Sequence, residues 1–234
     1  MQTLGIIGGI APESTIAYYR AIIRLHREQH VDGSYPPVII NSIDLTRMLG
    51  YVERGELGSL VSYIVAEIEK VERAGARLGL LASNTPHIAF DEISRLSPIP
   101  LISIIETAAT EAQRLGLKRV SLFGTRFTMQ GRFYPDVFAN ANIEIVPASP
   151  EEQAYIHDKY LGEMAKAIFL AETRDRIIQI IETLKSRERI DAVILGGTEL
   201  PLLLKAESAC GLPLLDTGEL HARKAVELMA SQGS

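Results

Sequence analysis

The sequence holds one cysteine in 234 residues, Cys210, which excludes an internal disulfide and a metal site built from several thiolates. It also lacks any apolar run approaching the roughly 18 residues that a membrane-spanning helix needs, so we expect no membrane partner. The first residues carry no basic segment ahead of an apolar core. We therefore expect no secretion signal and a cytoplasmic location.

An excess of basic residues is absent as well, because 24 Lys and Arg stand against 29 Asp and Glu, for a net charge of −5. Neither nucleic acid nor an anionic membrane surface is therefore an expected partner. The histidines show no ligand pattern, since His26 and His30 lack the glutamate of H-E-x-x-H, and we expect no metal. The glycines near the start do not spell G-x-G-x-x-G and no Walker lysine follows, which argues against a nucleotide.

The length suits one large domain or two of roughly 100 to 120 residues. Hydrophobic residues make up 47% and charged residues 23%, as in a globular protein. Short apolar runs such as Val38–Ser42 alternate with residues at helical spacing, and this alternation predicts an α/β fold with mostly parallel sheets flanked by helices. One helical face that we expect to point into the core carries Ile156, Tyr160, Met164 and Ile168.

Three landmarks recur after 113 to 116 positions, in the same order. The matching pairs are Gly8 with Gly124, Ser83 with Gly197, and Ile99 with Leu212. Their common order predicts two similar α/β halves, with the active-site cleft between them. We expect the first half to comprise residues 1–98 and 210–234, and the second half residues 99–209.

Two apolar runs stop at small polar residues. One run leads into Ser83–His87, of sequence SNTPH, and the other into Gly196–Glu199, of sequence GGTE. A buried parallel strand looks like this where it ends, and ligands bind beyond the carboxyl ends of such strands. The two segments are therefore the candidate site.

These segments resemble the motifs of the cofactor-independent aspartate/glutamate racemase superfamily, which carries Cys-Asn-Thr-x-His in one half and Gly-Cys-Thr-Glu in the other. The other residues of both motifs are retained here, whereas Ser83 and Gly197 stand where the family has its cysteines. The resemblance implies a small amino acid or carboxylate as ligand, chemistry without PLP or another cofactor, and a homodimer.

In the family, two thiols remove and return the α-proton of an amino acid. The hydroxyl of Ser83 is a much weaker acid than a thiol and needs a partner to take its proton, while Gly197 transfers no proton at all. We therefore expect the two-thiol chemistry to be lost or altered. His87 is a candidate partner for Ser83, or it packs at the start of the next helix. Glu199 is a candidate acid or base.

The sequence and the resemblance together give two sets of candidate residues. The catalytic candidates are Ser83, His87, Gly197 as the vacant thiol position, Thr198 and Glu199. The substrate-binding candidates are Gly9, Asn84, Thr85, Thr125, Arg47 and Lys166. A structural alternative is that the Ser, Thr and Asn side chains cap the helices that follow.

The same residues are compatible with two other functions. One is a hydrolase of small esters with Ser83 as nucleophile, His87 as base, and Thr198 or backbone N–H groups as the oxyanion hole. The surrounding sequence is not the G-x-S-x-G elbow, which counts against it. The other alternative is a non-catalytic binding protein.

Overall fold

The computed structural model describes residues 1–30 and 32–231, which form two compact units. The first unit comprises Met1–Ile104 and Gly218–Ser234, and the second comprises Ile105–Thr217. Both boundaries lie a few residues later in the chain than the sequence suggested. The reason is strand pairing, because the strand at Leu101–Ile102 joins the first sheet and the strand at Leu212–Asp216 joins the second.

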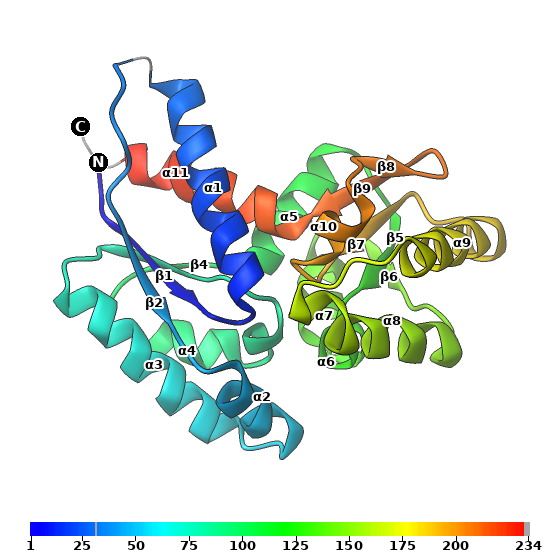
Figure 1. The fold of residues 1–234 in the computed structure, drawn as a ribbon, viewed down its shortest axis with the longest axis horizontal. Helices are drawn as coiled ribbons and strands as arrows, with labels where there is room; N and C mark the ends of the chain where they lie inside the picture. The colour runs from blue at the N-terminus through cyan, green and yellow to red at the C-terminus, as the bar shows by residue number, and fades with distance from the viewer. Residues whose placement is uncertain (31, 232–234) are drawn as a thin grey trace. The chain divides into compact units, whose positions relative to one another are not determined.

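The first unit is built on a parallel sheet of the order β2-β1-β3-β4 (Figure 1). Its strands are β1 (Leu4–Gly8), β2 (Val38–Ser42), β3 (Leu78–Leu81) and β4 (Leu101–Ile102). Its helices are α1 (Pro12–Gln29), α2 (Leu45–Glu53), α3 (Leu57–Arg73), η1 (Thr85–Ala89), α4 (Phe90–Leu96) and α11 (Thr217–Ser231), of which η1 is a 3-10 helix.

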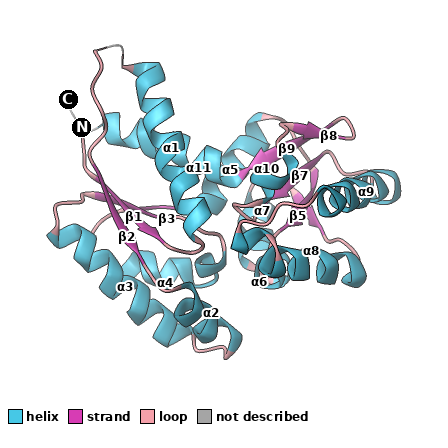
Figure 2. Cartoon of the chain, viewed as in Figure 1, coloured by secondary structure: helices cyan, strands magenta, loops and turns pink. Residues whose placement is uncertain are grey.

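Helices cover both faces of this sheet, which explains why its strands are apolar on both sides. Helices α1 and α11 pack on the face that carries Leu4, Ile6 and Leu80. Helix α3 packs on the opposite face, where a Cβ at Gly5 would lie 2.7 Å from Cγ2 of Val71. Figure 2 shows the same layers, with α1 and α11 on one side of the strands and α3 on the other.

The second unit is built on a sheet of the order β6-β5-β7-β9-β8, parallel except for the β8–β9 pair. Its strands are β5 (Arg119–Phe123), β6 (Glu144–Val146), β7 (Ala192–Leu195), β8 (Ser208–Ala209) and β9 (Leu212–Asp216). Its helices are α5 (Ile104–Arg114), α6 (Arg126–Gln130), α7 (Phe133–Asn140), α8 (Pro150–Gly162), η2 (Met164–Lys166), α9 (Ala171–Glu188) and α10 (Leu200–Leu204). Helices α8, α9 and α10 share one hydrophobic core with β5, β7 and β9.

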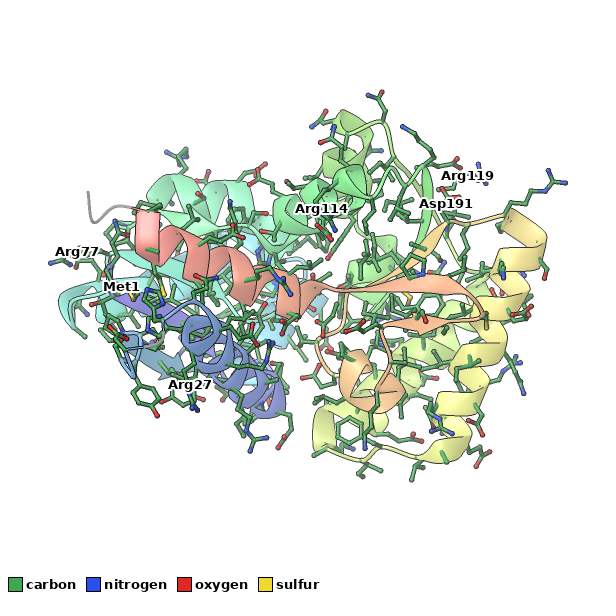
Figure 3. The ribbon with its side chains drawn as sticks, turned by 90° about the horizontal axis from the view of Figure 1, so that it is seen from above. Met1, Arg27, Arg77, Arg114, Arg119 and Asp191 are labelled. Carbon is green, nitrogen blue, oxygen red and sulfur yellow. The ribbon has the colours of Figure 1, made fainter. Side chains whose placement is uncertain are left out.

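The two sheets repeat one topology, because β2-β1-β3-β4 corresponds strand by strand to β6-β5-β7-β9. The predicted fold class of two similar, mostly parallel α/β halves is therefore confirmed. Both candidate segments follow the carboxyl ends of central strands, β3 in one unit and β7 in the other. The opposite, amino ends of the strands can be found in Figure 3, where Arg77 comes just before β3, Asp191 just before β7, and Arg119 begins the neighbouring strand β5.

One predicted helical face is shorter than expected. Ile156, Tyr160 and Met164 are buried in the core of the second unit, whereas Ile168 is 43% exposed. The reason is that α8 ends at Gly162 and the chain turns through η2 to Ala167, which has a left-handed backbone with φ of 58°. No helix within the described ranges combines the length and the apolar character needed to cross a membrane.

Candidate functional site

The first candidate segment leaves β3 and enters the 3-10 helix η1. The side chains of Ser83, Asn84 and Thr85 are all buried there, at 8%, 2% and 4% exposure. The segment is tied to the start of α1, because the Ser14 hydroxyl donates to the carbonyl of Ala82 at 3.3 Å. No described side chain or backbone group bonds the Ser83 hydroxyl, which leaves this hydroxyl available to a ligand.

His87 is fixed by backbone groups and not by the Ser83 hydroxyl. Its Nδ1 donates to the Ser83 carbonyl at 2.9 Å, and its Nε2 accepts from the N–H of Ile104 at 3.3 Å. The ring stacks on Phe90, and burial together with the charge of His221 lowers the pKa of His87 to about 3. Both ring nitrogens are thus occupied, so this geometry favours the helix-start role and gives no support to His87 as a base for Ser83.

A second buried histidine, His221, lies 6.4 Å from His87 between ring centroids. Its Nδ1 accepts from the Tyr18 hydroxyl at 2.8 Å, and its Nε2 donates to the carbonyl of Ile102 at 2.9 Å. These bonds connect α11 to α1 and to β4. Burial lowers the pKa of His221 to about 4, so both histidines are neutral near neutral pH.

Gly9 lies at the end of β1, in a turn that only glycine fits. Its φ is +83°, and a Cβ there would lie 2.3 Å from the carbonyl oxygen of Ile43. Its N–H donates to the hydroxyl of Thr15 at 2.7 Å. The amide of Gly9 is therefore already bonded within the first unit, and a role for Gly9 in holding substrate stays a prediction.

In the second unit, the ends of β5 and β7 approach closely. A Cβ at Gly124 would lie 2.8 Å from the carbonyl oxygen of Gly196, so glycine is needed for this approach. Thr125 follows, and its hydroxyl oxygen accepts from the N–H of Thr128 at 3.3 Å and so caps α6. Its structural role is thus clear, and its substrate-binding role stays a prediction.

Tyr160 and Glu199 form a buried pair beside the second segment. The Tyr160 hydroxyl, on α8, donates to Oε2 of Glu199, and the Thr198 hydroxyl donates to the same oxygen at 3.1 Å. Glu199 is 0% exposed, and Tyr160 is 8% exposed. Burial and the adjacent Glu199 carboxylate raise the pKa of the Tyr160 hydroxyl well above its ordinary value.

The ring of Tyr160 also fills the space next to Gly197. A Cβ at Gly197 would lie 2.3 Å from Cε2 of Tyr160 and 3.0 Å from Cζ, the carbon that bears the hydroxyl. The position where the resemblance implies a thiol is thus occupied by a phenol ring from another helix. Sequence reasoning assigned Tyr160 only to a core-facing stripe and missed this contact.

The two basic candidates lie on the surface. Arg47, in the first turn of α2, stacks over the ring of Tyr63 at 4.5 Å and donates to the Tyr51 hydroxyl at 3.2 Å. Lys166, in η2, is exposed. Ligand contact by Arg47 and by Lys166 stays a prediction. Within the described ranges, no group of three or more His, Cys, Asp and Glu side chains is placed to hold a metal ion.

Each unit therefore gathers its own polar group of candidates. In the first unit, β3 leads directly into Ser83, Asn84, Thr85 and His87. In the second unit, the ends of β5 and β7 bring together Thr125, Gly197, Thr198 and Glu199, with Tyr160 added from α8. Buried hydroxyl, amide and carboxylate groups at parallel strand ends suit a small polar ligand.

Comparison with known proteins agrees with this fold and with the family resemblance. The model of the Asp/Glu/Hydantoin racemase family matches residues 7–225, and the chain belongs to this family. A broad specificity amino-acid racemase from Bacillus subtilis is 24% identical over 230 residues, which cover 95% of this chain and 96% of that protein. A glutamate racemase from Aquifex aeolicus is 24% identical over 207 residues, or 86% and 77% of the two chains.

Solved structures give the same result. The crystal structure of an aspartate racemase homologue from Pyrococcus horikoshii superimposes with a TM-score of 0.84 at 35% identity. The match covers 99% of this chain and 100% of that one. The similarity therefore extends over both α/β units.

Proposed function

We propose that this protein binds a small amino acid or carboxylate at its two polar strand ends, without PLP, and that the two-thiol racemisation of its family is lost or altered. The observation that carries the proposal is that the polar residues of both motifs are buried although residues 83 and 197 are not cysteine. Asn84, Thr85 and Thr198 supply amide and hydroxyl groups of the kind that hold a carboxylate.

The Ser83 hydroxyl adds support for a ligand. No described group bonds this hydroxyl, and its oxygen is not among the fully buried side-chain atoms that lack a partner. The hydroxyl is therefore accessible, and a ligand oxygen or nitrogen placed beyond β3 can bond it. That both strand ends serve one ligand in a shared cleft is an expectation from the sequence and stays a prediction.

The hydrolase alternative has no support from the geometry. A serine nucleophile needs a base to accept its proton, and the candidate base, His87, uses both ring nitrogens for backbone bonds. Exchange of the ligand's α-proton in heavy water distinguishes an altered enzyme from a non-catalytic binding protein.

Titration calorimetry with D- and L-aspartate, D- and L-glutamate and alanine tests the proposal. We expect at least one of these to bind, and Asn84→Ala and Thr198→Ala each to weaken binding about tenfold or more, as loss of a hydrogen bond to a charged group does. Thr110→Ala is the control, because Thr110 is exposed on α5 and its hydroxyl bonds only the carbonyl of Glu106. Absence of binding by all five probes contradicts the proposal.

Two expectations about the protein as a whole also stay predictions. The resemblance implies a homodimer, which sedimentation equilibrium measures directly. The cytoplasmic location is inferred from the sequence alone, and cell fractionation checks it.

A further inference from the structure

In the second unit, another proton-bearing side chain lies at the position where the family motif has its thiol. The Tyr160 ring lies against Gly197, within 2.3 Å of where a Cβ would stand, and its hydroxyl is bonded to Glu199. The phenol thus lies at the strand end where the family motif has a proton-transferring group. This is a contact between α8 and the segment that follows β7, two elements of one unit.

A purely structural role does not explain why the Glu199 carboxylate is buried against the Tyr160 hydroxyl. A carboxylate with no exposed surface is costly to bury, and apolar residues of similar volume are often at least as stable. Glu199 is buried beside two hydroxyl groups, those of Tyr160 and Thr198, which both donate to it. Tyr160 is buried in the second unit, at 8% exposure.

We propose that Tyr160 and Glu199 form a proton relay that replaces the missing second thiol and acts on the α-proton of the bound ligand. In the forward step the phenol oxygen accepts the α-proton while the phenol proton passes to the Glu199 carboxylate. The C–H and the phenol O–H bonds break, a new phenol O–H and a carboxyl O–H form, and the electron pair stays on the ligand as a carbanion. The reverse step restores all three groups.

The relay has a stereochemical consequence. One oxygen both removes and returns the proton, so the proton comes back to the same face of the ligand. In heavy water the ligand gains deuterium once the Tyr160 hydroxyl has exchanged with solvent, and it keeps its configuration. Exchange without racemisation therefore distinguishes this relay from the two-sided chemistry of the family.

The test is α-proton exchange in heavy water with D- and L-aspartate and D- and L-glutamate, observed by proton NMR over several days, with configuration checked by chiral chromatography. We expect one enantiomer of a ligand that binds to lose its α-proton signal without inversion. Tyr160→Phe and Glu199→Gln should each slow exchange about a hundredfold or more, the usual contribution of a positioned acid or base. Affinity should stay within about threefold, as expected for groups that act on the reacting proton and contribute little to binding the ground state.

Tyr155→Phe is the matched control. Tyr155 lies on the same helix, α8, is partly buried, and has no contact with Glu199 among the described interactions. We expect its exchange rate to equal that of the unmodified protein. Glu199→Gln keeps the shape of the pair and tests the relay even if Tyr160→Phe does not fold.

The inference rests on the proposed function, and the two fail in different ways. A probe that binds in calorimetry yet keeps its α-proton overturns the relay and leaves the proposed function intact. Exchange that persists at the unmodified rate in Tyr160→Phe or Glu199→Gln also overturns the relay. Absence of binding by every probe overturns the proposed function, and it overturns the relay as well because the relay needs a bound ligand.

Discussion

The ring of Tyr160 lies where a side chain at residue 197 would begin, 2.3 Å from the Cβ position. Gly197 and Tyr160 are therefore matched to each other, since the absence of a side chain at one residue makes room for the ring of the other. The absence of a side chain at residue 197 is thus coupled to the packing of α8. Introducing a side chain there requires a change in both residues.

The first prediction concerns stability. Gly197→Ala should lower the free energy of unfolding by about 1–3 kcal/mol, because the new methyl group forces the Tyr160 ring out of its packed position. Gly162→Ala is the control, since Gly162 ends α8 and a Cβ there meets nothing within 4 Å. Urea unfolding measures both. Equal stability of the two variants contradicts the proposed contact between Tyr160 and Gly197.

The second prediction concerns restoration of the thiols. Ser83→Cys combined with Gly197→Cys should give no racemisation of aspartate, because the Tyr160 ring blocks the second thiol. Adding Tyr160→Leu replaces the ring with a smaller aliphatic side chain and should allow racemisation to appear. Circular dichroism of the amino acid follows the reaction. A double variant that racemises aspartate as fast as the triple variant contradicts this explanation.

The third prediction concerns ester hydrolysis. We expect the unmodified protein to hydrolyse p-nitrophenyl acetate no faster than Ser83→Ala, because His87 is bonded to backbone groups and takes no proton from Ser83. Release of nitrophenolate measures the rate. If Ser83→Ala hydrolyses the ester clearly more slowly than the unmodified protein, the result contradicts this prediction and supports the hydrolase alternative.

The fourth prediction concerns the dependence of stability on pH. Burial lowers the pKa of His87 to about 3 and that of His221 to about 4, both below the ordinary value of the unfolded chain. The unfolded state therefore binds more protons below about pH 6.5, and stability is lost as the pH falls from there toward the folded-state values. Each histidine lowers the free energy of unfolding by an amount that approaches about 1.4 kcal/mol per pH unit.

Urea unfolding between pH 7 and pH 4.5 measures this slope. His221→Gln removes one titrating group, so we expect its stability to fall less steeply than that of the unmodified protein, whatever its stability at pH 7. The histidine ring signals in NMR give a second check. If the ring protons of His87 and His221 titrate near pH 6.5 in the folded protein, the lowered pKa values of the two histidines are contradicted.

Local sequence patterns were enough to predict the fold and the strand ends that the two candidate segments follow. Apolar runs that stop at polar residues, such as those before Ser83 and Gly196, predicted β3 and β7 with their carboxyl ends at the motifs. The near-constant separation of paired landmarks predicted two halves of one topology. Each apolar run and each landmark is a short stretch of chain, and its character follows from burial and from the chemistry of strand ends.

Contacts between distant stretches were not predictable in the same way. Helical spacing showed that Tyr160 faces the core, but it did not show that the ring meets Gly197 and Glu199, which lie 37 and 39 positions further along the chain. The bonds of His87 to backbone groups were likewise invisible, because a backbone partner leaves no trace in the side-chain sequence. The unit boundaries depended on strand pairing, which the apolar runs alone do not give.

Ligand binding at the two motifs is tested most directly by amide NMR of the isotopically labelled protein during titration with aspartate. We expect the amide signals of Asn84, Thr85, Thr198 and Glu199 to shift with one common affinity, and those of Thr110 on α5 to stay unchanged. Shifts confined to other surfaces, or no shift at millimolar aspartate and glutamate, would contradict the proposal that this family member still holds a small amino acid or carboxylate.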